Sequence, residues 1–332
     1  SRCMETRGIK IKVARLPIPV LYGPAFEGER VRKENLKIEF GSKYSVAFEY
    51  LRSKPMKDVE DGKIELIGPD TTDTDTKAMP LGILVEVAAR NFNKDFEPIL
   101  ERQIHRYINE AQGVMHMGQR DMNWIRISQE AYDKGLRLKH FGIILHALLH
   151  KDFGAIVDKV QVTLFTKEED VRKYIQEARI AFQARDERLK DMTDESVDTF
   201  YSCTLCQSFA PNHVCIITPE RLGLCGAYSW LDAKAAYEIT PTGGNQPIKK
   251  GACLNQTLGQ WKNINDFVYE KSNKNISEVN MYSILVSPQS SCGCFECIVA
   301  LLPEASGVMI VSRDYTGMPP LGMTFTQLAS SV

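Results

Sequence analysis

The cysteines of this chain are concentrated in its second half, and this asymmetry constrains its organisation more than any other feature. Eight of the nine cysteines lie after residue 200, and only Cys3 precedes it. A chain of 332 residues can bury a core without a disulfide framework, and an odd number of cysteines fits such a framework poorly. We therefore expect the thiols to act as metal ligands in a reducing compartment, and we place the start of a second domain near Thr193.

The composition is that of an ordinary globular chain, with 43% hydrophobic and 25% charged residues, and the length is typical of about two domains. A formal net charge of −1 argues against a protein that binds the phosphate backbone of nucleic acids. The longest apolar runs, 141–150 and 297–303, are shorter than the roughly 18 residues of a membrane helix. The N-terminus lacks the apolar segment of a secretory signal. We expect a cytoplasmic protein with no nucleic-acid or membrane partner.

The first half of the sequence combines strand and helix patterns. Hydrophobic residues alternate with lysines over 9–16, and residues 82–89 and 160–165 carry the hydrophobic residues of further strands. Between the last two, residues 96–111 place apolar side chains at helical spacing. These patterns predict an α+β (mixed α/β) fold, and no glycine-rich nucleotide-binding motif accompanies them.

A heavily charged helix is predicted to connect the two halves. Residues 166–169, Thr-Lys-Glu-Glu, have the form of a capping box, and apolar residues recur on one face of the segment that follows, to about Met192. We accordingly divide the chain into a mixed strand and helix domain over 1–166, a connecting helix over 167–192 and a metal-cluster domain over 193–332.

Four cysteines of the second half form a candidate metal site. Cys203, Cys206, Cys215 and Cys225 follow the pattern C-x2-C-x8-C-x9-C. Four thiolates suit a tetrahedral site for zinc or an iron–sulfur cluster. A zinc ribbon pairs two C-x2-C units, whereas the second half of this pattern has long spacers. Uneven spacing suits the separated corners of a 4Fe–4S cubane better, so the pattern favours a cluster and leaves zinc as the alternative.

The segment 292–294, Cys-Gly-Cys, is a second candidate site. Two thiolates and the deprotonated backbone nitrogens of Gly293 and Cys294 close chelate rings in one plane around a metal ion. Square-planar coordination is typical of Ni(II) or Cu(II), and nickel suits a thiol-rich reducing site better. Both sulfurs keep lone pairs, so they can bridge to a second metal that takes a third thiolate from the cluster. The alternative is a tight turn that carries two unrelated core cysteines.

Four segments carry a family resemblance. They are YSCTLCQSFAPNHVC (201–215), LCGAYSWLDAKAAYEI (224–239), SCGCFEC (291–297) and GMPPLGMTF (317–325). Together they resemble acetyl-CoA synthase, the β subunit of acetyl-CoA decarbonylase/synthase complexes, and the resemblance extends over nearly the whole chain. Members of that family continue beyond both ends of this sequence, so we expect a chain truncated at both ends.

The resemblance implies an A-cluster, a 4Fe–4S cubane joined to two nickel ions. It assigns the cubane to Cys203, Cys206, Cys215 and Cys225. Cys206 would also bridge to the proximal nickel. Cys292 and Cys294 would bridge the two nickels, and the backbone nitrogens of Gly293 and Cys294 would complete the plane of the distal nickel. Phe209 would shield the proximal nickel, although an ordinary core aromatic is the alternative for this residue.

The same resemblance implies an acyltransferase that condenses CO, a methyl group and coenzyme A into acetyl-CoA, a reaction of anaerobic carbon fixation in the Wood–Ljungdahl pathway. A corrinoid iron–sulfur protein would supply the methyl group, CO and methyl would combine on the proximal nickel, and the CoA thiolate would release the acetyl group. A CO dehydrogenase subunit is the second expected partner, although the domain that docks it in bacterial members precedes this segment. The alternative is a non-enzymatic zinc or iron–sulfur module for electron transfer or scaffolding.

Coenzyme A needs cationic groups for its phosphates and an aromatic ring for its adenine. Arg120, Trp124 and Arg126 offer both, and the alternative is a core tryptophan beside solvated arginines. Two further cysteines, Cys253 and Cys297, have no evident metal partner, and we expect them to be small buried residues.

Three histidines are further candidates for functional residues. His213 lies between two cluster cysteines in the sequence, so it is expected either to hydrogen-bond a sulfur or to lie exposed in a loop. His146 and His150 form an i, i+4 pair, a possible metal pair. They lack the glutamate of the metalloprotease motif, so we expect a pair on a helix surface or in the core.

Overall fold

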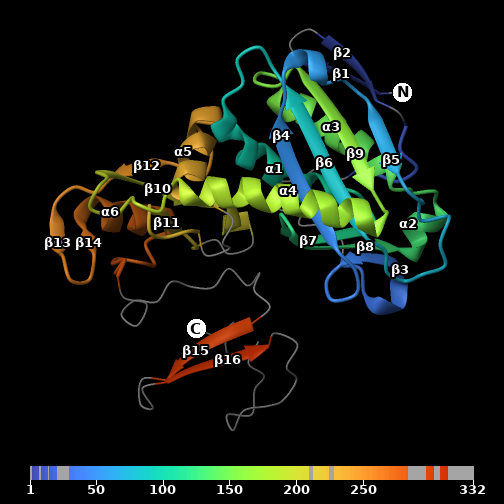
Figure 1. Cartoon of the computed structure of the whole chain (residues 1–332). Coiled ribbons are helices and arrows are strands. Elements are labelled where there is room, and N and C mark those ends of the chain that lie inside the picture. The colour runs from blue at the N-terminus through green and yellow to red at the C-terminus, as the bar shows by residue number, and fades with distance from the viewer. Residues whose placement is uncertain are drawn as a thin grey trace. The chain divides into compact units, whose positions relative to one another are not determined.

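The structure, a computed structural model, describes residues 2–6, 9–13, 15–20, 30–208, 212–223, 228–282, 297–302 and 307–312 (Figure 1). The chain divides into two compact units, residues 1–191 and 192–332. Helices and strands occur in both, which confirms the α+β fold predicted from the sequence. The division into a mixed domain, a connecting helix and a metal-cluster domain stays a prediction. No helix in the described ranges is long and apolar enough to cross a membrane.

The first unit is built on a four-stranded sheet. Its strands, in spatial order, are β4 (Ala47–Ser53), β6 (Leu81–Ala88), β9 (Lys159–Phe165) and β5 (Ile64–Ile67). β6 runs parallel to β4 and antiparallel to β9, and β5 runs parallel to β9. The two strands predicted over 82–89 and 160–165 are therefore neighbours at the centre of this sheet.

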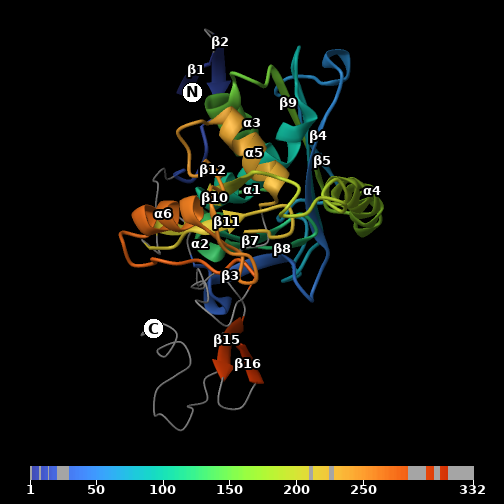
Figure 2. The same cartoon turned by 90° about the vertical axis from the view of Figure 1, so that its left-hand side faces the viewer.

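Helices cover both faces of this sheet. α1 (Glu97–Asn109) and α3 (Lys139–Phe153) pack on one face, and α4 (Glu168–Glu187) packs on the other (Figure 2). Alternate residues of β4 point to the same face, so Phe48 and Tyr50 both meet α4. The face of α4 buried against them is the one that the sequence predicts, namely Val171, Ile175, Ala178 and Phe182.

A second sheet and several short elements complete the described part of the first unit. β3 (Leu36–Gly41), β8 (Met122–Ser128) and β7 (Val114–Gln119) form an antiparallel sheet in that order. β1 (Arg2–Thr6) and β2 (Ile9–Val13) form a hairpin that includes the first predicted strand. The short helices of this unit are α2 (Gln129–Asp133), η1 (Lys33–Asn35), η2 (Met56–Asp58) and η3 (Lys94–Phe96).

The start of α4 differs from the prediction. Its N-cap is Lys167, which makes no side-chain capping hydrogen bond. Thr166 Oγ1 instead donates to the Pro69 carbonyl oxygen at 2.7 Å, and Thr166 N–H donates to the Ile67 carbonyl oxygen at 3.0 Å. The predicted capping box is therefore wrong, because hydrogen bonds to the end of β5 take the groups that a local cap would use. The helix ends at Glu187, before the predicted end.

The described part of the second unit contains a small sheet with one helix on each face. Strand β10 (Thr199–Cys203) lies between β11 (Cys215–Ile217) and β12 (Pro247–Lys249) and is antiparallel to both. α5 (Trp230–Ile239) contacts β10, and α6 (Lys262–Lys271) contacts β12. Its other short elements are η4 (Leu205–Ser208), β13 (Cys253–Asn255), β14 (Gln260–Trp261), β15 (Cys297–Leu302) and β16 (Gly307–Ser312).

The two faces of the small sheet belong to different cores. One core joins Phe200 of β10 to Ile264 and Val268 of α6. The other joins alternate residues of β10 and β11 to Ala233 of α5, namely Tyr201, Cys203, Cys215 and Ile217. Because side chains alternate along a strand, both cysteines lie on the face that α5 covers.

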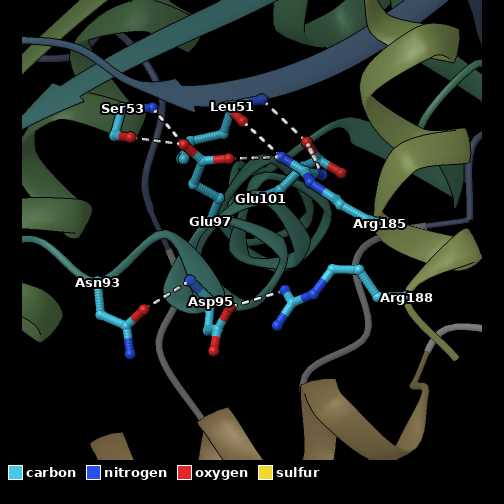
Figure 3. Close-up of polar contacts among 8 residues, drawn as sticks. All are labelled: Leu51, Ser53, Asn93, Asp95, Glu97, Glu101, Arg185 and Arg188. Carbon is cyan, nitrogen blue, oxygen red and sulfur yellow. Dashed lines mark hydrogen bonds and ion pairs between the residues drawn. The ribbon is translucent and has the colours of Figure 1, made fainter.

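Arg185, near the C-terminal end of α4, joins three elements of the first unit (Figure 3). Its guanidinium donates to Glu101 Oε2 at 3.0 Å, to Glu97 Oε2 at 3.3 Å and to the Leu51 carbonyl oxygen at 2.9 Å. Leu51 N–H also donates to Glu101 Oε2, at 3.0 Å. Ser53 N–H donates to Glu97 Oε1 at 2.8 Å. Two nearly buried carboxylates of α1 are thereby paired with one cation of α4 and with the backbone of β4.

We expect Arg185→Ala to lower the free energy of unfolding of the first unit by about 3–5 kcal/mol, because it leaves two nearly buried carboxylates without their cation. Arg188→Ala is the matched control on the same helix end. It removes an exposed pair, in which Arg188 donates to Asp95 Oδ1 at 2.7 Å, and should cost less than about 1 kcal/mol. Urea unfolding followed by circular dichroism compares the two, and equal losses would contradict the central role of Arg185.

A buried chain of hydrogen bonds links β4, β7 and α1. Glu49 and His116 are completely buried, and His116 Nε2 lies 2.6 Å from Glu49 Oε2. His116 Nδ1 lies 2.8 Å from His105 Nδ1. Burial raises the pKa of Glu49 to about 8 and lowers the pKa of His116 to about 3; burial and the neighbouring His116 lower the pKa of His105 to about 4. These three side chains are therefore neutral near pH 7, with Glu49 as a protonated acid that donates to His116.

We expect these three buried side chains to contribute most to the stability of the first unit near pH 6.5. Above that pH the folded protein keeps the Glu49 proton that the unfolded chain releases, so stability falls as the pH rises toward 8, by up to about 1.4 kcal/mol per pH unit. Below it the unfolded chain protonates both histidines first, so stability falls toward pH 4.

Glu49→Gln should remove the alkaline loss and make the acid loss steeper, because Glu49 no longer offsets part of the histidine protonation. The amide can still donate to His116 but cannot titrate, so the loss of stability above pH 6.5 should disappear. Urea midpoints measured at a series of pH values test this. A glutamine variant with the same alkaline loss as the original chain would show that Glu49 is not its source.

Candidate metal centre

Two of the predicted cluster ligands lie opposite each other in the second unit. Cys203 ends β10 and Cys215 begins β11, and they are direct partners in the antiparallel pair. Side chains of such partners share a face, with Cβ atoms about 4.5–5.5 Å apart. Cys203 is 7% exposed and Cys215 is 5% exposed. The strand register therefore brings two distant cysteines of the sequence to one buried site.

A loop after α5 holds the strand that carries Cys203. The Gly244 carbonyl oxygen accepts Thr204 N–H at 3.2 Å and Ser202 Oγ–H at 3.1 Å. Asn245 Nδ2–H donates to the Ser202 carbonyl oxygen at 3.0 Å. A Cβ atom at Gly244 would lie 2.9 Å from Thr204 Oγ1, so the close approach favours glycine. The backbone on both sides of Cys203 is thus fixed by hydrogen bonds.

His213 contacts the second of these sulfurs. Its Nε2 lies 3.1 Å from Cys215 Sγ, and its side chain is only 2% exposed. The contact with a sulfur expected from the sequence is confirmed, and the alternative of an exposed loop histidine is wrong. A ring N–H donates a charge-assisted hydrogen bond to a thiolate and favours the ionised form that binds metals.

The remaining cysteines are described to different extents. Cys206 lies in η4, the short helix that follows β10. Outside the described residues lie Phe209, Cys225 and the segment 292–294 with Cys292, Gly293 and Cys294. Cys253 is exposed in the two-stranded β13–β14 ribbon, so its predicted burial is wrong: the short ribbon leaves β13 uncovered. Cys297 begins β15, and its burial stays a prediction.

The donors described fit a thiolate-bound metal group. They comprise two buried sulfurs on adjacent strands and an imidazole at hydrogen-bond distance from one of them. Both zinc and an iron–sulfur cluster use such ligands. The apolar residues around the sulfurs limit the access of water, which stabilises a thiolate group of either kind against exchange.

The candidate coenzyme A residues belong to the β7–β8 hairpin of the first unit, where they make two separate sets of contacts. The Arg126 guanidinium lies 4.6 Å from the centre of the Trp124 ring, and its Nε donates to Glu39 Oε2 at 2.6 Å. Arg120 donates to both carboxylate oxygens of Asp186, at 2.9 and 3.0 Å. A phosphate group would compete with these carboxylates. The role of the three residues in binding coenzyme A stays a prediction.

We expect His213→Phe to speed the release of metal from this centre by about 10–100-fold, because an aromatic ring fills the space without donating to Cys215. His213→Gln keeps an N–H donor and should retain metal more nearly as the original chain does. The measurement is the rate of metal transfer to a chelator. Equal rates for the original chain and His213→Phe would show that this hydrogen bond does not support the metal site.

Two family descriptions match adjacent parts of the chain. The description "CO dehydrogenase/acetyl-CoA synthase complex beta subunit" matches residues 18–171. The description of the C-terminal part of the "ACS/CODH beta subunit" matches residues 182–332. The residues before the first match and those between the two matches are few. The stretch between the matches lies within α4.

Individual relatives are similar over almost the whole chain. The "Carbon monoxide dehydrogenase/acetyl-CoA synthase subunit alpha" of Moorella thermoacetica is 52% identical over 99% of this chain and 45% of its own length. The "Acetyl-CoA decarbonylase/synthase complex subunit beta" of Methanopyrus kandleri is 41% identical over 94% of this chain and 67% of its own length. Subunit beta 2 from Methanocaldococcus jannaschii is 44% identical over 94% of this chain and 66% of its own length. The chain thus spans 45% to 67% of the length of these relatives.

Proposed function

Because the chain belongs to the family of β subunits of CO dehydrogenase/acetyl-CoA synthase complexes, we propose that it forms acetyl-CoA from CO, a methyl group and coenzyme A. It would act as an acyltransferase, and its metal centre would be an A-cluster made of a 4Fe–4S cubane and two nickel ions. The names of the relatives support acetyl-CoA as the product.

The observation that carries this proposal is the register that pairs Cys203 with Cys215 on a buried face. Both cysteines belong to the set whose spacing favours a cubane. An antiparallel pair fixes two ligands at neighbouring positions and supports a cluster whose further ligands come from other segments. The contact between His213 and the Cys215 sulfur supports it further, because hydrogen bonds to sulfur tune the potential of iron–sulfur clusters.

The ligand assignment follows the family resemblance, together with the cysteine spacing. The cubane would be held by Cys203, Cys206, Cys215 and Cys225. Cys206, Cys292 and Cys294 would bind the proximal nickel, and the two sulfurs of 292–294 with the Gly293 and Cys294 nitrogens would bind the distal nickel. When bound, this group supplies the chemistry that joins CO to a methyl group and transfers acetyl to the CoA thiol. Phe209 would form an apolar cover over it.

The residues around the two buried sulfurs prepare a rigid and dry site. Tyr201, Ile217 and Ala233 pack around them. Trp230 meets Tyr201 edge-on, with ring centres 5.8 Å apart, and its Nε1–H donates to the Thr199 carbonyl oxygen at 3.0 Å. These contacts hold α5 over the ligand face. A low-dielectric surrounding strengthens the electrostatic interactions of any charged group bound there.

Partners and substrate follow from the same proposal. A CO dehydrogenase subunit would supply CO, and a corrinoid iron–sulfur protein would supply the methyl group. For coenzyme A, Arg120 is a better phosphate ligand than Arg126. Its partner Asp186 is 60% exposed and can be displaced, whereas Glu39, the partner of Arg126, is only 5% exposed.

We expect Cys292→Ser and Cys294→Ser to abolish nickel binding and acetyl-CoA formation while most of the iron stays bound. Cys203→Ser and Cys215→Ser should lose the iron, because they remove ligands of the cubane. Iron and nickel contents after anaerobic reconstitution with nickel, and the formation of acetyl-CoA from CO, a methyl donor and coenzyme A, are the measurements. Cys253→Ser is the control, since that thiol is exposed and is assigned no ligand role.

Three results would overturn the proposal. Equal losses of iron and nickel in Cys292→Ser and Cys294→Ser would contradict the division of ligands between the two cysteine segments. Zinc in place of iron in the unmodified chain would support the non-enzymatic zinc module. Iron without any nickel after reconstitution would support an electron-transfer module.

A further inference from the structure

Two histidines of α3 and one aspartate of a distant turn converge in the first unit. His146 Nε2 and His150 Nε2 lie 3.1 and 2.7 Å from the same oxygen, Asp61 Oδ1. The three ligand atoms all lie within 4.8 Å of one another. The sequence predicts the helical pair of histidines but gives no signal for the carboxylate, which is 85 residues away from His146. The expected helix pair is thus only part of the arrangement.

The aspartate is held in place by β9. Val160 N–H donates to Asp61 Oδ1 at 2.9 Å, and Gly62 N–H donates to the Val160 carbonyl oxygen at 3.0 Å. Gly62 has a φ of +79°, a conformation that favours glycine and lets the turn before β5 bring Asp61 to the helix. Since α3 packs on both β9 and β5, the histidines and the aspartate are fixed on one rigid body.

The distances between these atoms suit a common metal ion. Two ligands each about 2.1 Å from a metal lie about 3.0–3.4 Å apart in octahedral or tetrahedral geometry, which is close to the 3.1 and 2.7 Å between Asp61 Oδ1 and the two imidazole nitrogens. Without a metal, Asp61 Oδ1 must accept three donors, from both imidazoles and from Val160 N–H. Asp61 Oδ1 is thus directed at both imidazoles, and the geometry alone brings three possible ligand atoms together.

We propose that Asp61, His146 and His150 form a mononuclear site for a divalent transition-metal ion, with Zn²⁺ as the preferred ion. Imidazole nitrogen and carboxylate oxygen are ligands that Zn²⁺ uses, and three protein ligands leave a position for water. The Asp61 side chain is 40% exposed, whereas those of His146 and His150 are 12% and 6% exposed, so the open position and the entry path face solvent on the side of Asp61. The bound ion connects α3 to the turn before β5, and no thiolate is among its ligands.

The test compares Zn²⁺ and Co²⁺ binding in variants of the metal-loaded full chain. His146→Ala and Asp61→Asn each remove one ligand. Each should weaken binding of the added ion by at least about 100-fold, because losing a residue that only hydrogen-bonds a metal ligand already lowers metal affinity by up to that factor. His140→Ala is the control on the same helix, because His140 Nδ1 accepts Arg137 N–H and takes no part in the site. Any metal taken up by the cysteines is common to all variants and cancels in the comparison.

Two readouts identify the site. Added Zn²⁺ should raise the unfolding temperature of the original chain and of His140→Ala, but not that of His146→Ala or Asp61→Asn. Because the readout is the shift caused by the metal, a variant that is itself less stable still reports on the site. The difference spectrum with Co²⁺ should show weak visible bands without the near-ultraviolet charge transfer of thiolate ligands. Equal Zn²⁺ responses in all variants, or thiolate bands alone, would overturn the proposal.

Discussion

The guanidinium of Arg185 decides how α1, α4 and β4 meet. Removing a carboxylate from water costs several kcal/mol, and Glu97 and Glu101 are both nearly buried, so neither is tolerated there without a cation. Even beside Arg185, burial raises the pKa of Glu101, which shows how incompletely the pairing offsets the cost. The ion pairs of Arg185 with Glu97 and Glu101 therefore specify how the three elements pack more than they stabilise the fold. Since α4 is the last helix of the first unit, the same contacts fix where the chain leaves that unit.

In the second unit the corresponding constraint is strand register. Side chains alternate along a strand, so a slip of one residue between β10 and β11 would turn one cysteine away from the other and expose apolar side chains. Ile216 and Ile217, which belong to cores on opposite faces, resist such a slip. The hydrogen bonds of Gly244 resist it as well, because they hold the residues on both sides of Cys203. The placement of the two candidate ligands thus follows from ordinary core packing.

The sequence predicts well those features that depend on neighbours in the chain. The apolar face of α4 follows from helical periodicity, whereas the position of His213 between cysteines left a sulfur contact and an exposed loop residue both open, and the fold decides for the contact. Features that depend on distant segments were missed or wrong. Thr166 has the pattern of a helix cap, but its hydroxyl donates to the carbonyl of Pro69, two residues after β5. Asp61 joins His146 and His150 only through the fold, and nothing in the sequence pairs it with them.

Burial of Cys203 and Cys215 bears on the order of assembly. With 7% and 5% of their surface exposed, these thiols are out of reach of an incoming cluster while α5 covers them. If these thiols bind the proposed cluster, it must arrive before α5 closes, or during a local opening that breaks the hydrogen bond between Trp230 and the Thr199 carbonyl. Under the proposed function, delivery of the metal would then be coupled to the folding of this unit, and maturation would be limited by the opening of α5 rather than by the diffusion of metal.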